Sequence, residues 1–133
     1  MKNILKLTII TPEKEFYSGE VSDLVTENQY GRLGFLPEHI AMVTVLKPSV
    51  TTFTEKDGKK LRAFTSSGIL SINDDEINLM CDASEWPEDI DINRAEEARK
   101  RAEMRLKENT GVNMDRSEVA LMRALMRIKA RSI

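Results

Sequence analysis

The sequence predicts an α+β fold, with an all-β sandwich or flattened barrel over residues 1–85 and an antiparallel hairpin of two helices over residues 86–133. Three observations support this prediction. Short segments of alternating apolar residues fill the first part. Two tight-turn signals separate pairs of these segments, as in β-hairpins. From the segment SEWPED onward, the sequence changes to alanine-rich, strongly charged stretches with helical spacing.

The earliest strand is expected in the segment MKNILKLTII, where Leu5, Leu7 and Ile9 alternate with residues of the opposite face. A second short apolar group follows at residues 21–25. Several short strands joined by regular turns are typical of sandwiches and flattened barrels. We therefore expect a layered β-domain before the first helix.

Two turn signals lie farther along this part of the chain. In EKDGKK, Asp57-Gly58 supplies the positive φ of a tight turn between VTTFT and LRAFT. The segment NDDE separates GILSI from INLMC in the same way. Each signal predicts a β-hairpin.

The first helix is expected soon after the segment SEWPED. Pro87 interrupts strand pairing, and either Asp89 or Asp91 can cap the helix by accepting a hydrogen bond from an unpaired backbone N–H. Mostly small side chains recur along one face, where they permit another helix to approach closely: Ala95, Ala98, Ala102 and Leu106.

A second helix is expected after the segment KENTGVN, in which Gly111 can adopt the left-handed conformation that ends a helix. Asp115 and Glu118 have the spacing of a capping box, with Asp in the usual Ser/Thr position. The apolar face of this helix is expected to contain Ala120, Leu121, Ala124, Leu125 and Ile128.

The charge balance excludes several classes of partner. Residues 1–85 carry 9 basic and 13 acidic side chains (−4) and residues 86–133 carry 11 and 9 (+2), which gives the net charge of −2. A surface with this balance does not attract nucleic acid or anionic lipid as a whole. Aromatic residues are too scarce for base-stacking platforms, and an alanine-rich seam is a poor membrane anchor. The two parts are expected to contact different partners.

The sequence lacks the parts of an ordinary catalytic site. It contains no nucleophile–base pair, Walker loop or dinucleotide glycine motif. His39 is the single histidine, so clustered zinc ligands are excluded and a general base would lack an identifiable partner. Cys81, the single cysteine, is interpreted as a buried small hydrophobe in a reducing compartment. The N-terminal segment is too short and polar for a membrane span, and we expect a cytoplasmic protein.

Arginines are the most informative side chains of the helical part. Those on the first helix recur on roughly one face, and those on the second are each four residues apart, a spacing at which like charges repel by about 0.2–0.5 kcal/mol per pair. Two effects can offset this repulsion: the helix dipole, which favours basic residues near a C-terminus, and a bound anion such as a phosphate chain or an acidic protein surface. These arginines are Arg94, Arg101 and Arg105, then Arg123, Arg127 and Arg131.

Three stretches together resemble one family, the ε subunits of bacterial F-type ATP synthases. YGRLGFLPEHIAMVTVLKP resembles the Gly-x-x-Gly-x-Leu-Pro-Gly-His signature of that family's β-domain, and TSSGIL resembles its later Ser-Gly-Gly segment. IDINRAEEARKRAEMRL resembles its C-terminal Ile-Asp-x-x-Arg-Ala helix. The resemblance covers essentially the whole chain in the right order.

Three positions depart from the family pattern. Glu38 and Ser67 stand where the family usually or often has glycine, so we expect the local turns to differ in detail. Arg32 occupies a loop position that is acidic in some members and faces the membrane rotor ring.

The resemblance implies a noncatalytic rotor subunit of a proton- or sodium-translocating synthase, peripheral on the cytoplasmic face of the bacterial plasma membrane. The β-domain would bind the γ subunit and the c-ring, with Gly31, Arg32 and His39 at the interface. The helical hairpin would either fold against the β-domain or extend along γ toward acidic loops of the catalytic β subunits. In the extended state it would inhibit ATP hydrolysis.

Some members of that family also bind ATP in the folded hairpin, as a regulatory ligand and not as a required cofactor. Guanidinium groups from two helices can converge on phosphates, while carboxylates orient the base or the arginines. By motif position, the matching residues are Glu85, Ile90, Asp91, Arg94, Ala95, Arg101, Arg123 and Arg127.

Two other functions use the same sequence features. The first is a free-standing nucleotide-binding sensor, for which binding is itself the function. The second is a transcription-factor-like helical hairpin that enters another enzyme's channel. Such factors usually place acids at the hairpin tip, whereas KENTGVN has one glutamate in a short loop.

Overall fold

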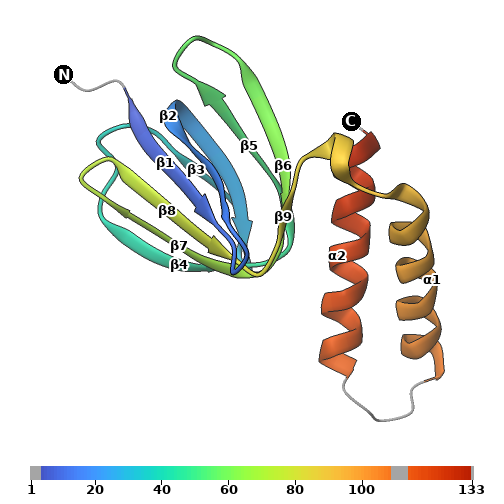
Figure 1. The fold of residues 1–133 in the computed structure, drawn as a ribbon. Helices are drawn as coiled ribbons and strands as arrows, with labels where there is room; N and C mark the ends of the chain where they lie inside the picture. Colours follow the sequence, from blue (N-terminus) through green and yellow to red (C-terminus); the bar gives the residue numbers. More distant parts are fainter. Residues whose placement is uncertain (1–3, 109–113, 133) are drawn as a thin grey trace.

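The computed structural model describes residues 4–108 and 114–132, and it confirms the predicted order of a β-domain followed by two helices (Figure 1). Within these residues the strands are β1 (Leu5–Ile10), β2 (Glu15–Asn28), β3 (Gly31–Phe35), β4 (Met42–Leu46), β5 (Ser49–Glu55), β6 (Lys60–Thr65), β7 (Gly68–Asn73), β8 (Glu76–Cys81) and β9 (Ser84–Glu85). They are followed by a 3-10 turn, η1 (Pro87–Asp89), and by α1 (Ile92–Glu108) and α2 (Met114–Ser132).

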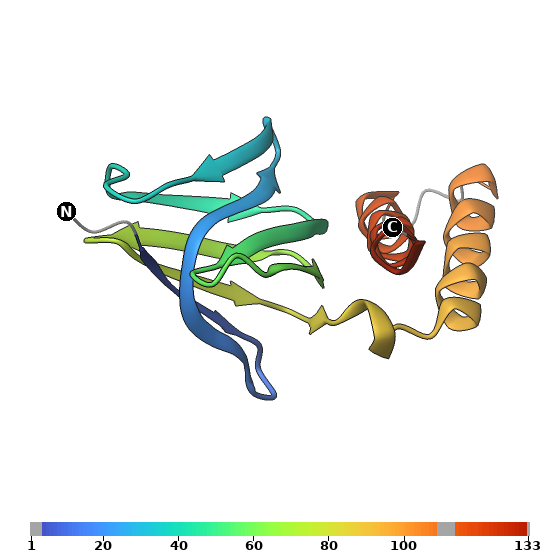
Figure 2. The same ribbon diagram turned by 90° about the horizontal axis from the view of Figure 1, so that it is seen from above.

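Strand β2 joins the two layers of the β-domain. Its first half pairs with β1, and its second half pairs with β3 and β5 after a register shift between Val21 and Asp23. The strand order is β1-β8-β7-β4-β2-β5-β6-β9, with β3 beside β2. The sheet therefore folds over on itself, and the long curved β2 runs across both layers in Figure 2.

Both predicted hairpin turns are present. The β5–β6 turn contains Gly58 with φ of 95°, and the β7–β8 turn contains Asp74 and Asp75 with φ of 50° and 61°. Positive φ at both Asp74 and Asp75 is what a tight two-residue hairpin turn requires. The β5–β6 connection is longer, because residues 56–59 lie between the strands and only Gly58 of these has positive φ. The apolar group at residues 21–25 proved to be the middle of a much longer strand than the pattern indicated.

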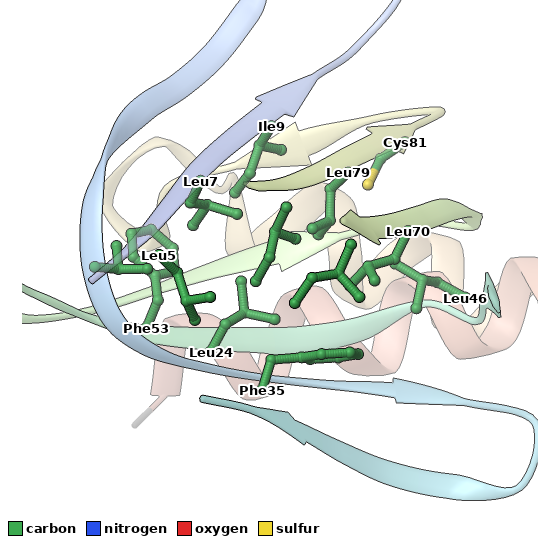
Figure 3. Close-up of a cluster of buried hydrophobic side chains, with 13 residues drawn as sticks. Leu5, Leu7, Ile9, Leu24, Phe35, Leu46, Phe53, Leu70, Leu79 and Cys81 are labelled. Carbon is green, nitrogen blue, oxygen red and sulfur yellow. The ribbon is translucent and has the colours of Figure 1, made fainter. Parts of the chain in front are cut away.

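The main core lies between the two layers (Figure 3). The inward side chains of β1 interlock with apolar residues of β2, β7 and β8, and all are fully buried. Burying such side chains contributes roughly 1.5–3 kcal/mol each. The cluster comprises Leu5, Leu7, Ile9, Val21, Leu24, Phe35, Leu46, Phe53, Leu70, Ile72, Ile77, Leu79 and Cys81.

A ring of buried hydroxyl groups completes the interior where β2, β5 and β6 meet. The Oγ atoms are joined by distances of 2.9 Å from Thr26 to Thr51, 2.7 Å from Thr51 to Thr65, 3.4 Å from Thr65 to Ser49, and 3.3 Å from Ser49 to Thr26. Each hydroxyl can donate to the next around the ring, which satisfies polar groups that have no access to water.

The two helices lie side by side and run antiparallel, as the alanine pattern predicted (Figure 1). Ala95, Ala102 and Ala124 are buried, whereas Leu125, expected on the apolar face, is 41% exposed. The apolar face predicted for the second helix was therefore too wide, because it included Leu125. The helix-ending Gly111 and the side chain of Asp115, on which the capping-box prediction depends, lie outside the described part of the structure.

The hairpin rests on the β-domain through α2, which packs against β5 and β6. A second, smaller core joins them, formed by Phe64 of β6, Ile90 of the linker and Ala130 of α2, with Val50 and Met126 at its edge. Among the described residues, no helix is long and apolar enough to cross a membrane.

Candidate functional site

A cavity of about 340 Å³ lies where the β-domain, the linker and both helices meet. Its position gives it walls from three separate parts of the chain: β9, the segment around η1, and the facing sides of α1 and α2. The lining residues are Glu85, Asp89, Asp91, Arg94, Ala95, Ala98, Arg101 and Arg127.

Arg127 links the cavity to the β-domain. Its Nε donates to Oε1 of Glu85 at 2.5 Å, and its guanidinium lies 4.6 Å from the centroid of the Phe64 ring. Both partners of the ion pair are about two-thirds buried, with side-chain exposures of 30% and 33%. A charge-assisted bond combined with a cation–π contact fixes this guanidinium in place.

Asp91 sets the start of α1 at the rim of the cavity. Its Oδ1 accepts from the backbone N–H of Arg94 at 3.2 Å, and its carbonyl accepts from the N–H of Ala95 at 3.0 Å. Of the two predicted caps, Asp91 therefore caps α1, while Asp89 belongs to the 3-10 turn begun by Pro87. The capped helix directs its positive end toward the cavity, where an anion would be favoured.

The structure brings six of the eight predicted nucleotide residues together in this lining: Glu85, Asp91, Arg94, Ala95, Arg101 and Arg127. Two lie elsewhere. Ile90 is 4% exposed and packs in the second core. Arg123 donates to Ser66 Oγ at 3.0 Å and lies 3.6 Å from Asp82, so it contacts the β-domain outside the cavity.

Asp89 and Ala98 line the cavity but were not among the predicted residues. Ala98 belongs to the alanine stripe, so helical spacing could have indicated it. Asp89 was considered only as a helix cap. With it, the lining carries three carboxylates and three guanidinium groups, which offset one another in charge.

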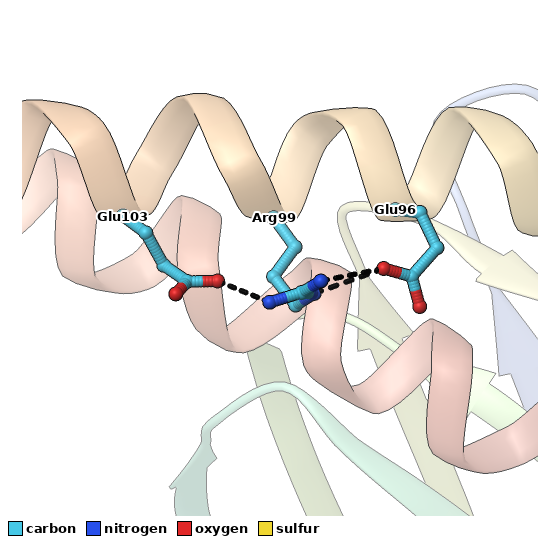
Figure 4. Close-up of polar contacts among 3 residues, drawn as sticks. All are labelled: Glu96, Arg99 and Glu103. Atoms are coloured by element: carbon cyan, nitrogen blue, oxygen red, sulfur yellow. Dashed lines mark hydrogen bonds and ion pairs between the residues drawn. The ribbon is translucent and has the colours of Figure 1, made fainter.

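Arg99 of α1 does not line the cavity. It is held between Glu96 and Glu103 on its own helix, with Nη2 2.8 Å from Glu96 Oε2 (Figure 4). The hydrogen bond to Glu96 and the charges of both glutamates raise the pKa of the Arg99 guanidinium. This arginine is compensated locally and adds little positive charge to the cavity.

The predicted interface residues lie at the start of β3 and in the loop between β3 and β4. Gly31 begins β3 with φ of 127°, and Arg32 beside it is exposed. The His39 ring packs 4.8 Å from that of Phe35, and its Nδ1 lies 2.8 Å from the carbonyl oxygen of Ile40. Within the described residues, no group of acidic, histidine or cysteine side chains could hold a metal ion.

An exposed apolar strip crosses the outer face of one layer. Cross-strand partners place Val45 beside Ile69, Ile69 beside Met80, and Met80 beside Ile10. These four side chains, from β4, β7, β8 and β1, are between 39% and 69% exposed. Sequence reasoning missed the strip, although MVTVL carries apolar residues on both faces of its strand, which is the signal of a strand with two covered faces.

Cys81 is buried, as its alternation with Leu79 predicted. Burial raises the pKa of its thiol to about 11, so the group stays protonated near neutral pH. A protonated buried thiol is a poor nucleophile.

Comparison with protein families assigns both parts of the chain. Residues 4–87 match the β-sandwich domain of the ATP synthase delta/epsilon chain, and residues 88–131 match its long α-helix domain. In fold, the chain is similar to a chain in the Euglena gracilis mitochondrial ATP synthase structure of OSCP, F1 and c-ring. That match has a TM-score of 0.86 and 20% identity, and covers 98% of this chain and 82% of the other.

Full-length relatives agree with this assignment. The ATP synthase epsilon chain of Clostridium kluyveri is 50% identical over 128 residues, 96% of this chain and 97% of the relative. That of Clostridium botulinum type A (strain Hall) is 47% identical over 133 residues, the full length of both. The chain therefore belongs to the ATP synthase delta/epsilon chain family, whose members are noncatalytic stalk subunits of the synthase.

Proposed function

We propose that this chain is a regulatory rotor subunit of a bacterial F-type ATP synthase, peripheral on the cytoplasmic face of the plasma membrane. Its β-domain binds the γ subunit and the c-ring, and its helical hairpin controls ATP hydrolysis by the catalytic β subunits. ATP acts as a regulatory ligand that holds the hairpin closed. The observation that carries this proposal is the cavity lined jointly by β9, the linker, α1 and α2.

The apolar strip supports docking of γ on the outer layer of the β-domain. Exposed apolar side chains that neighbour one another across four strands mark protein interaction sites. The strip faces away from the sandwich interior and is formed by strands other than β5 and β6, on which α2 packs. The γ subunit can therefore remain bound while the hairpin changes position.

The β2–β3 turn supports contact with the c-ring. Gln29 and Tyr30 form its tip, where Tyr30 is 87% exposed, and Gly31 and Arg32 follow at the start of β3. An exposed tyrosine beside an arginine is typical of interface hot spots. A basic residue here contacts a polar or acidic loop of the ring.

A ligand in the cavity would stabilise the closed hairpin because its walls come from parts that separate on opening. Arg94 and Arg101 come from α1, Arg127 from α2, and Glu85 from β9. A nucleotide that contacts all three parts binds the closed state better than the open state and shifts the population toward it. The guanidinium groups of the lining can pair with the phosphates of such a nucleotide.

Opening the hairpin would expose arginines that are bound to groups of the β-domain in the closed state. Arg123 contacts Asp82 and Ser66, and Arg127 contacts Glu85, so both meet groups of the β-domain while α2 is docked. Once α2 leaves, these guanidinium groups can pair with acidic loops of the catalytic β subunits. The same side chains thus serve both positions of the hairpin.

The alternative of a free-standing nucleotide sensor would use the same cavity. It gives no role to the exposed apolar strip, which a monomeric soluble protein tends to avoid. A stable complex with γ would exclude this alternative, whereas a chain that never associates with γ would support it.

Calorimetric titration of ATP into the isolated chain tests the nucleotide site. A charge-assisted contact contributes roughly 1.5–3 kcal/mol, so Arg94→Ala should weaken binding by about tenfold or more. Arg105→Ala is the matched control, because Arg105 lies on the same helix outside the lining. Absence of binding to the unmodified chain at millimolar ATP, or equal weakening by both substitutions, would contradict the site.

A further inference from the structure

We infer that Arg62 of β6 is a docking latch: it caps the C-terminal end of α2 from the β-domain and sets how often the hairpin opens when no nucleotide is bound. This inference rests on the proposed opening of the hairpin. It adds a control point that lies outside the nucleotide cavity.

The contact joins two elements far apart in the sequence. Arg62 Nε donates to the carbonyl oxygen of Ala130 at 2.9 Å. Ala130 lies in the last turn of α2, where backbone carbonyls have no N–H partner within the helix. A cation at this end also meets the negative end of the helix dipole. The β-domain therefore supplies a cap that α2 cannot make from its own backbone.

The contact lies where the C-terminal end of α2 packs against β6. Ala130 is fully buried and packs with Phe64, which lies two residues beyond Arg62 and so on the same face of β6. Phe64, Ile90 and Ala130 form the apolar part of this contact. Its polar part consists of the Arg62 bond and a hydrogen bond from Arg131 Nη1 to the Pro87 carbonyl oxygen at 3.0 Å. Losing the Arg62 bond separates a half-buried guanidinium from the carbonyl that it caps.

The latch and the nucleotide site are separate in space. Arg62 is absent from the lining of the 340 Å³ cavity and instead lines another groove, of about 690 Å³, formed mainly by β2, β3, β5 and β6. Replacing it changes the closed population without removing a nucleotide contact. Any weakening of ATP binding would then follow from the smaller fraction of closed molecules.

Thiol labelling of the full chain without nucleotide measures the latch. One reporter is a cysteine introduced at Ile90, which is 4% exposed and packs with Ala130 near the C-terminal end of α2. The other is a cysteine at Ser66, which is 1% exposed and accepts a hydrogen bond from Arg123, two turns before Ala130 on α2. When opening is rare and reversible, the labelling rate is proportional to the open population. The native Cys81 in the main core reports global unfolding.

If Arg62 acts as the latch, Arg62→Met should speed labelling at both reporters by roughly tenfold or more, because it removes the guanidinium and with it the charge-assisted hydrogen bond to Ala130. Arg62→Lys, which keeps the charge but not the planar donor, should have a smaller effect. Lys60→Met is the control, since Lys60 lies on the same face of β6 and is exposed. Labelling of Cys81 should stay slow in every variant.

Three results would overturn the latch. One is unchanged labelling at both positions in Arg62→Met. A second is acceleration at position 90 alone, which would mean that only the last turn of α2 frays. The third is equal acceleration by Lys60→Met. Because no nucleotide is present, a failure to bind ATP in calorimetry would remove the proposed ligand and leave the labelling result standing.

Discussion

Glu38 and Asp75 both have left-handed backbone conformations, with φ of 65° and 61°. This conformation costs a non-glycine residue roughly 1–2 kcal/mol. A hydrogen bond from the Glu38 N–H to Asp75 Oδ1, at 2.6 Å, offsets part of that cost and ties the loop before β4 to the β7–β8 turn. Glutamate thus occupies a backbone position that favours glycine.

Gly68, in the segment TSSGIL, is required for a different reason. A Cβ atom added to it would lie 2.1 Å from the Met80 carbonyl oxygen and 2.8 Å from the Cys81 Cα. Strand β7 is paired on both sides, with β4 and β8, so the backbone has little freedom to move away. The neighbouring Ser67 has no positive φ, and its carbonyl accepts from the Asp82 N–H.

We expect Gly68→Ala to lower the free energy of unfolding by roughly 1–3 kcal/mol or more, as overpacking against fixed backbone does. Gly34→Ala is the control, because a Cβ atom there meets nothing within 4 Å and the φ is not positive. Urea unfolding monitored by circular dichroism compares the two. Equal stability of both variants would mean that β7 and β8 can separate without cost.

At the scale of elements, the hydroxyl ring fixes the pairing of β2, β5 and β6. Its four members are all buried, and a one-residue register slip would bring an apolar or exposed neighbour into the ring. Removing one hydroxyl leaves two partners each short of a hydrogen bond in a place without water.

Thr51→Val should therefore destabilise the chain by about 1–3 kcal/mol, although the side-chain volume is nearly unchanged. Thr52→Val is the control substitution, since Thr52 is exposed on the opposite face of β5. The midpoint of chemical unfolding decides between them. A larger loss in Thr52→Val would contradict a structural role for the ring.

Sequence patterns predicted the elements whose signals are local. Alternation located β1, turn chemistry located the β5–β6 and β7–β8 hairpins, and alanine spacing located the paired helices. Patterns could not give the length of β2, because a bent strand that changes layers has no single period. MVTVL is apolar on both faces of its strand, which indicates a second covered face, but the extent of the apolar strip follows only from the cross-strand neighbours of Val45. Motif resemblance, not periodicity, indicated the cavity residues.

At the scale of the whole molecule, the hairpin and the β-domain are joined by a short linker that is anchored by packing at each end. Trp86 stacks on Phe16 at 4.5 Å and packs against the main core, whereas Ile90, four residues later, packs with Ala130 in the second core. Residues 87–89 lie between these two anchors. We therefore place the hinge of the proposed opening there, beginning two residues beyond the predicted end of the β-domain at residue 85.

The most direct test of the account is the rate of ATP hydrolysis by the assembled synthase with and without residues 88–133. The shortened chain keeps Trp86 in the β-domain core and retains the apolar strip and the β2–β3 turn, so assembly with γ and the c-ring should persist. If the hairpin restrains hydrolysis, the enzyme that contains the shortened chain should hydrolyse ATP faster than the complete enzyme at equal content of this subunit. An unchanged rate in a fully assembled complex would contradict the regulatory role of the hairpin.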